Sequence, residues 1–209
     1  MPQRTTLTVG ISARHVHLSP EDLICLFGHG YQLHVKAPLS QPGQFAAEET
    51  VALAGPRGRL ERVRILGPTR GATQVELSPT DARSLGVNPP VRLSGDHRET
   101  PGIGIEGPQG RIEIPSGVII AWRHIHMLPT EAVEFGLQDR DVVLVKTTGD
   151  RAVIFEQVIV RVRPESGLEL HIDTDEGNAA GLKNGDSVEI IGRQQPSDRD
   201  LAALGAKKA

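Results

Sequence analysis

Short apolar runs broken by turn residues dominate the chain and predict a mainly β fold. Apolar and β-branched residues favour strands over residues 6–9, 60–65, 74–77, 118–122, 141–145, 153–162 and 187–191. Helical spacing of apolar positions is confined to four short windows, at residues 20–26, 79–85, 129–135 and 176–182. Many short strands with few helices are typical of barrels or sandwiches rather than of βαβ units.

One segment of the sequence recurs after about half the chain. Residues 14–22 (RHVHLSPED) are similar to residues 123–131 (RHIHMLPTE). A shorter element, in which a helix is ended by a glycine and followed by a strand, recurs with Gly86, Gly136 and Gly181 at the helix ends. The repeats predict two similar small β-barrels with short capping helices, related by internal duplication.

Composition and charge narrow the class of protein. Apolar residues make up 38% of the chain, and the 23 glycines and 15 prolines suit a folded protein with many turns. The net charge of −3 gives no electrostatic basis for binding nucleic acid. No apolar run approaches the roughly 18–20 residues that a membrane helix needs. The single cysteine, Cys25, excludes a disulfide scaffold, and its apolar neighbours predict a buried thiol.

Paired histidines are the strongest candidates for chemistry. His15 and His17 stand two residues apart, as do His124 and His126, and in an extended strand both imidazoles of such a pair point to one face. Two copies in matching context, each preceded by arginine, favour metal binding. The alternative is a set of structural histidines in a repeated turn, each of which must satisfy two ring nitrogens.

Two metal ions would need further ligands, and two segments of alternating polar and apolar residues offer them. Glu76 and His171 each stand among apolar neighbours, where a polar side chain lies either on an exposed face or in a site. Imidazole and carboxylate ligands fit zinc, and by type also cobalt, manganese or iron. His29, His34 and His97 have no repeated context, so we expect them to lie outside the site.

Arginines around one predicted strand could bind an anion. Arg57, Arg64 and Arg70 flank or lie in this strand, and Arg70 precedes Glu76 by six residues. A guanidinium close to a divalent cation is a common way to hold phosphate. Solvated surface charge is the alternative interpretation of these arginines.

Taken together, these segments resemble the PduL-type phosphate propanoyltransferases, a family of phosphotransacylases. The resemblance spans about residues 7–192 and rests on RHVHL (14–18), GPRG (55–58), VRILGP (63–68) with Arg70, TQVELS (73–78), RHIHM (123–127) and HIDTDEGN (171–178). It implies a duplicated β-barrel with two metals per chain and a metal site between the barrels. The implied domains are 14–121 for one barrel, 1–13 with 122–192 for the other, and a flexible tail at 193–209.

The resemblance also implies roles for individual residues. One zinc would be held by His15, His17 and Glu76, and the other by His124, His126 and His171. Arg70 would be the catalytic residue that contacts phosphate. Contacts with coenzyme A would come from Ile11, Ser12, Ala13, Arg57, Arg64 and Asn178.

The implied reaction converts a short-chain acyl-CoA and phosphate into acyl phosphate and coenzyme A, with propanoyl-CoA or acetyl-CoA as the substrate. Two other classes of function stay open. One is a dinuclear metallohydrolase that cleaves thioesters or phosphoesters with zinc-bound hydroxide. The other is a zinc-structured module that binds coenzyme A or a partner without catalysis.

The resemblance bears on partners and compartment as well. Expected ligands are acyl-CoA, phosphate and two zinc ions, without nucleic acid or membrane. Candidate partners are further copies of the chain and the shell or core enzymes of a bacterial microcompartment, as in propanediol degradation. Many relatives carry an N-terminal encapsulation peptide, whereas only about six residues precede the first predicted strand here. We therefore expect the microcompartment lumen if such a peptide has been removed, and the cytoplasm if the native chain has none.

Overall fold

The computed structural model describes residues 5–195 and divides them into two compact units. The first unit combines residues up to Ser12 with those from Trp122 onward, and the second consists of residues 13–121. Each unit is built from short strands and contains two short helices.

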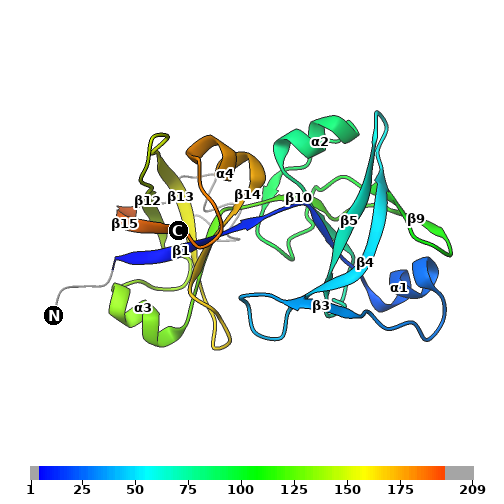
Figure 1. Cartoon of the computed structure of the whole chain (residues 1–209), viewed down its shortest axis with the longest axis horizontal. Helices are drawn as coiled ribbons and strands as arrows, with labels where there is room; N and C mark the ends of the chain where they lie inside the picture. Colours follow the sequence, from blue (N-terminus) through cyan, green and yellow to red (C-terminus); the bar gives the residue numbers. More distant parts are fainter. Residues whose placement is uncertain (1–4, 196–209) are drawn as a thin grey trace. The chain divides into compact units, whose positions relative to one another are not determined.

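Six strands close the first unit into a barrel. Their order is β1 (Thr6–Ser12), β14 (Glu169–Asp173), β11 (His124–Met127), β13 (Ile154–Val162), β12 (Val142–Lys146) and β15 (Ser187–Gln194), which returns to β1. β1 comes from the start of the chain, pairs in parallel with β14 and antiparallel with β15, and appears in Figure 1 as the blue strand beside the orange β15. Val9, Ile125 and Leu170 belong to the apolar core of this unit.

The second unit is an open sheet of nine strands. Its order is β7 (Val91–Arg92), β10 (Val118–Ala121), β6 (Gln74–Glu76), β2 (His15–His17), β5 (Arg59–Gly67), β4 (Phe45–Ala54), β8 (Ile103–Glu106) and β9 (Arg111–Ile114), with β3 (Val35–Pro38) paired to β4. The mainly β fold with short helices is confirmed. Of the two expected barrels, one is closed and the other is open.

Four helices lie where the sequence predicts them, within two residues at either end. They are α1 (Pro20–Phe27), α2 (Pro79–Leu85), α3 (Pro129–Phe135) and α4 (Thr174–Ala180). The first three begin with proline, whose fixed φ suits the first helical position. Gly86, Gly136 and Gly181 adopt the left-handed conformation that ends α2, α3 and α4.

The sequence pattern missed the long strand β4. Its sequence, FAAEETVALA, is rich in alanine and glutamate, which favour helices in isolation. In the structure β4 lies between β5 and β8 and pairs with both. Pairing on both sides outweighs the local preference, which is a weak guide when tertiary contacts oppose it.

Cys25 is exposed, so the prediction of a buried thiol is wrong. The buried face of α1 carries Leu23, Leu26 and Phe27. Cys25 and Ile24 both lie on the outer side of the helix. Neighbours in a helical sequence point in different directions, so apolar neighbours do not bury the residue between them.

The expected tail, residues 193–209, is described only as far as residue 195. Arg193 and Gln194 continue β15, and residues 196–209 lie outside the described part of the chain. Within the described part, no helix combines the length and the apolar character needed to cross a membrane.

Candidate functional site

Three side chains from neighbouring strands of the second unit form a first set. β2 places His15 and His17 on one face and Val16 in the core, because successive residues of a strand point to opposite faces. Glu76 on β6 stands opposite His15, and its Oε2 atom lies 3.5 Å from Nε2 of His15. Donor atoms of His15, His17 and Glu76 all lie within 4.8 Å of one another, a spacing that suits a metal ion.

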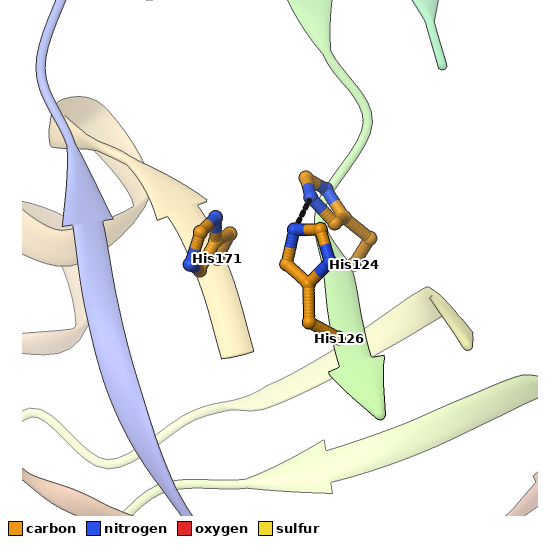
Figure 2. A group of neighbouring side chains, drawn as sticks. All are labelled: His124, His126 and His171. Carbon is orange, nitrogen blue, oxygen red and sulfur yellow. Dashed lines mark hydrogen bonds between the residues drawn. The ribbon is translucent and has the colours of Figure 1, made fainter. Parts of the chain in front are cut away.

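Three imidazoles form a second set in the first unit. His124 and His126 share one face of β11, whereas Ile125 between them lies in the core. The ring centroid of His171 on β14 lies 5.3 Å from that of His124 and 4.7 Å from that of His126. Figure 2 shows the two imidazoles of β11 beside His171, with a dashed line joining the Nε2 atoms of His124 and His126, which are 3.0 Å apart. The donor atoms of this set also lie within 4.8 Å of one another.

Both sets follow the same strand plan. In each unit, the histidine strand runs antiparallel to the strand that carries the third side chain. His15 is paired with Glu76 in one unit, and His124 with His171 in the other. The third position is therefore the same in the two sets, although a carboxylate occupies it in one and an imidazole in the other.

The first histidine of each pair is held by a backbone carbonyl. Nδ1 of His15 lies 2.8 Å from the oxygen of Ala13, and Nδ1 of His124 lies 2.7 Å from the oxygen of Trp122. A carbonyl oxygen can only accept, so Nδ1 donates in both residues. In the neutral ring the Nε2 lone pair is then left for an ion.

The arginine before each pair ties the histidine strand to a helix. NH1 of Arg14 lies 3.0 Å from Oδ1 of Asp81 in the first turn of α2. Nε of Arg123 lies 2.8 Å from Oε1 of Glu176 in the first turn of α4. The repeated arginines therefore have matching structural partners in the two units.

The chemistry of the first set fits a metal ion. Nδ1 of His17 is buried and, among the described residues, has no hydrogen-bond partner. Burial, followed by the charges of His15 and Arg70, lowers the pKa of His17 to about 3, so its ring is neutral at physiological pH. Burial also acts to lower the pKa of His15, but the carboxylate of Glu76 outweighs it and the pKa is raised. A neutral imidazole and a carboxylate are ordinary ligands of zinc.

Arg70 lies close to the first set and is connected to it through two residues that the sequence analysis did not identify. NH1 of Arg70 donates to Oγ of Ser94 at 3.0 Å. Nε2 of Gln74 donates to the same Oγ at 2.9 Å and to Oε1 of Glu76 at 2.6 Å. Burial lowers the pKa of Arg70, and the carboxylate of Glu76 acts against that change. A cation suited to binding an anion is thus tied to a candidate metal ligand.

The amide of Gln74 has only one orientation. Its Oε1 accepts from the backbone N–H of Gly95 at 2.7 Å and lies 3.1 Å from Nε2 of His97. Gly95 N–H can only donate, and the carboxylate of Glu76 can only accept, so the amide cannot be reversed. His97, which we expected outside the site, therefore helps to hold the residue that orients Glu76. A polar residue two positions before a ligand on a short buried strand is the signal that could have found Gln74.

Four of the residues expected to contact coenzyme A lie at the end of β1 and on α4. Ile11 and Ser12 end β1, and the N–H of Ile11 donates to Oδ1 of Asn184 at 2.6 Å. Ala13 follows and uses its carbonyl oxygen to hold His15. Asn178 is exposed on α4. Their contacts with coenzyme A remain predictions.

Two arginines of the second unit complete the expected coenzyme A residues. Arg57 is exposed in the turn between β4 and β5, where its side chain packs close to Gly86 at the end of α2. NH1 of Arg64 donates to the carbonyl oxygens of Ala47 and Glu48 at 2.9 and 2.8 Å. The guanidinium of Arg64 is therefore held by the backbone of β4, and its contact with coenzyme A also remains a prediction.

Known proteins are similar to nearly the whole chain. A family model for phosphate propanoyltransferase matches residues 8–183. The chain is 56% identical over 186 residues to the phosphate propanoyltransferase of Thermotoga maritima. The aligned region covers 88% of this chain and 89% of that protein. The phosphate propanoyltransferase of Shewanella putrefaciens is 53% identical over 189 residues (90% and 89%), and that of Salmonella typhimurium is 51% identical over 179 residues (85% and 85%). With a match of this extent, the chain belongs to the phosphate propanoyltransferase family.

Proposed function

We propose that this protein is a phosphotransacylase that interconverts a short-chain acyl-CoA and phosphate with an acyl phosphate and coenzyme A. Propanoyl and acetyl groups are the proposed substrates. Membership of the phosphate propanoyltransferase family supports this reaction. The observation that carries it is the hydrogen-bonded connection from Arg70 through Ser94 and Gln74 to Glu76, which joins an anion-binding group to a candidate metal ligand.

We further propose that each set of three side chains holds one zinc-type ion. His15, His17 and Glu76 would hold one ion, and His124, His126 and His171 the other. Such an ion, when bound, supplies a Lewis acid for a carbonyl or phosphoryl oxygen and has affinity for sulfur. A set of three protein ligands for one zinc ion is typical of catalytic rather than structural zinc sites.

Arg70 would bind and orient the phosphate. Its planar guanidinium has five N–H donors in a fixed fork, and NH1 is held by Ser94. Two parallel hydrogen bonds from such a fork fix the direction of an oxyanion as well as neutralising its charge. One phosphate oxygen then attacks the thioester carbonyl carbon, the new C–O bond replaces the C–S bond, and the sulfur leaves as the thiolate of coenzyme A.

Coenzyme A would be bound by Ile11, Ser12, Ala13, Arg57, Arg64 and Asn178. Guanidinium groups at Arg57 and Arg64 suit the phosphates of the coenzyme, and the side-chain amide of Asn178 suits its polar groups. Ile11 and Ser12 at the end of β1, together with Ala13 that follows, offer backbone groups for the same ligand. Because carbonyl oxygens of β4 already hold Arg64, its side chain would lose little freedom on binding.

Release of free thiol from propanoyl-CoA or acetyl-CoA, measured with and without phosphate, tests the proposal. We expect release that depends on phosphate and is matched by formation of acyl phosphate. Equal release without phosphate would instead make the protein a thioester hydrolase. No release with either substrate would favour a module that binds without catalysis.

A further inference from the structure

Glu169 occupies the place in the first unit that Gln74 occupies in the second. Each lies two residues before the third member of its set, and each stands opposite the second histidine of the pair. Each also contacts that third member directly. Nε2 of Gln74 donates to Oε1 of Glu76 at 2.6 Å, and Oε2 of Glu169 lies 2.7 Å from Nε2 of His171.

The two contacts are chemically matched to different ligands. A ligand carboxylate, as at Glu76, has only acceptor oxygens, so its neighbour must donate, and Gln74 presents an amide N–H₂. A ligand imidazole has a second ring nitrogen that carries a proton, so its neighbour must accept, and Glu169 presents a carboxylate. Where the third ligand differs between the units, the neighbouring residue differs in the corresponding way.

We propose that Glu169 is a positioning residue for the set of His124, His126 and His171. Its carboxylate accepts the Nε2 proton of His171, which fixes the tautomer and leaves the Nδ1 lone pair for the ion. In the other set, Glu76 also uses one polar atom for its neighbour and turns the second toward the set. Its Oε1 contacts Gln74 and its Oε2 lies toward His15. The inference rests on the proposed function only in treating these three imidazoles as a metal site.

Gly10 provides the room for this contact. β1 pairs with β14 so that Gly10 stands opposite His171. A Cβ atom at Gly10 would lie 2.6 Å from Oε2 and 2.7 Å from Cδ of Glu169, too close for the carboxylate to stay in place. Gly10 does not adopt a positive φ, so the backbone itself accepts alanine. Gly10→Ala is therefore a way to displace the Glu169 carboxylate without changing any charge.

Zinc affinity of the metal-free protein, measured by competition with a chelating dye, tests the positioning role. Replacing the hydrogen-bond partner of a metal-bound histidine lowers metal affinity by about 10- to 100-fold. Glu169→Gln removes the negative charge of the acceptor, and Gly10→Ala displaces the acceptor itself. We expect this loss of affinity at one of two zinc sites in both Glu169→Gln and Gly10→Ala. Matched controls are Glu156→Gln, an exposed carboxylate on β13, and Gly192→Ala on β15, where the nearest atom to a new Cβ is 3.9 Å away. Both controls should bind zinc like the wild type.

The tautomer provides a readout that a merely structural residue would not change. In the zinc-loaded protein labelled with ¹⁵N-histidine, we expect NMR spectra in which Nδ1 of His171 is metal-bound and Nε2 keeps its proton. A metal-bound Nε2, or a loss of affinity above a thousandfold in Glu169→Gln, would make Glu169 a direct ligand and overturn the proposal.

Unchanged affinity in both Glu169→Gln and Gly10→Ala would overturn the positioning role and leave the phosphotransacylase proposal standing. A wild-type protein that binds no zinc would overturn the positioning role and the metal part of the proposed function together. Loss of phosphate-dependent thiol release with normal zinc binding would instead contradict only the proposed reaction.

Discussion

At the scale of single residues, Arg70 combines a fixed charge with a fixed direction. Arg70→Lys keeps the charge but replaces the planar fork of donors by a point charge. We expect the KM for phosphate to rise and the second-order rate constant for phosphate to fall by about 10- to 150-fold, equivalent to losing about 1.5–3 kcal/mol of charge-assisted hydrogen bonding. Steady-state kinetics with phosphate varied at saturating acyl-CoA measures this.

Kinetics with acyl-CoA varied provide the control for the Arg70 variant. The KM for acyl-CoA should change much less, because the proposed contacts of the coenzyme lie at other residues. A weaker acyl-CoA interaction with unchanged phosphate dependence would show that Arg70 binds the phosphates of the coenzyme instead.

Glu49 shows how a buried carboxylate stabilises the second unit away from the site. It accepts hydrogen bonds from the hydroxyl of Tyr31 at 2.9 Å and from the backbone N–H of His34 at 3.1 Å, and it lies 2.6 Å from Nδ1 of His34. Burial acts to raise the pKa of Glu49, but these hydrogen bonds outweigh it, and the pKa is lowered from its ordinary value of 4.5. The ionised form is therefore favoured by folding, and its contribution is present above pH 4.5 and lost as the pH falls through the lowered pKa.

Glu49→Gln should lower the free energy of unfolding by about 1–3 kcal/mol at pH 7, since hydrogen bonds to a charged group are lost. The difference from the wild type should shrink as the pH falls through the lowered pKa of Glu49, where the wild-type carboxylate itself becomes protonated. Urea unfolding at pH 7 and pH 3 measures both values. Glu48→Gln, at the exposed neighbouring position, should change little at either pH. A difference at Glu49 that does not vary with pH would show that packing, not charge, is responsible.

At the scale of elements, the loop after β7 holds β6 and Arg70 in one arrangement. Ser94→Ala removes the contact of Arg70 with the loop but leaves the bond between Gln74 and Glu76. We expect the KM for phosphate to rise about 2- to 10-fold, the effect of one ordinary hydrogen bond, with unchanged metal content.

Gln74→Met should raise the KM for phosphate and also lower metal retention, because it removes the bond to Glu76. Ser84→Ala, on the exposed side of α2, serves as the control. Equal effects of Ser94→Ala and Gln74→Met on metal content would contradict this division of roles.

The sequence pattern predicts the elements whose signal is local. Proline at the first helical position and glycine at the helix end identify α2 and α3, and β-branched runs identify β5 and β13. β4 was missed because alanine and glutamate carry a helical preference that only pairing with β5 and β8 overcomes. Local patterns describe what a segment prefers alone, and strand pairing decides the rest.

The same limit applies to the candidate site. The histidine pairs could be identified because one-residue spacing places both rings on one face, and because the pattern recurs. Ser94 could not, because its contacts depend on a loop that returns from elsewhere in the chain. Gln74 and Glu169 stand out in the sequence only as polar residues two positions before a ligand, and what they contact depends on strand register. Which residue stands opposite a ligand is a property of the sheet, not of the segment.

At the scale of the whole molecule, each unit carries its own candidate metal set. Elemental analysis of protein purified without chelators should therefore find about two zinc-type ions per chain. His124→Ala should reduce this to about one ion and abolish turnover, while the set of the second unit keeps its ion. Circular dichroism would check that the variant remains folded. One ion or none in the wild type would contradict the model with two centres.

The pairings of β1 and β10 carry a consequence for the ancestry of the chain. β1 leads directly into the histidine strand β2, yet it pairs in parallel with β14 of the first unit. β10 leads directly into β11, yet it pairs in parallel with β6 of the second unit. In a half-length chain with one copy of the repeat, the same pairing would require exchange of this leading strand with a second copy, which is a domain-swapped dimer. With both copies in one chain the exchange is intramolecular, so this pairing does not depend on protein concentration.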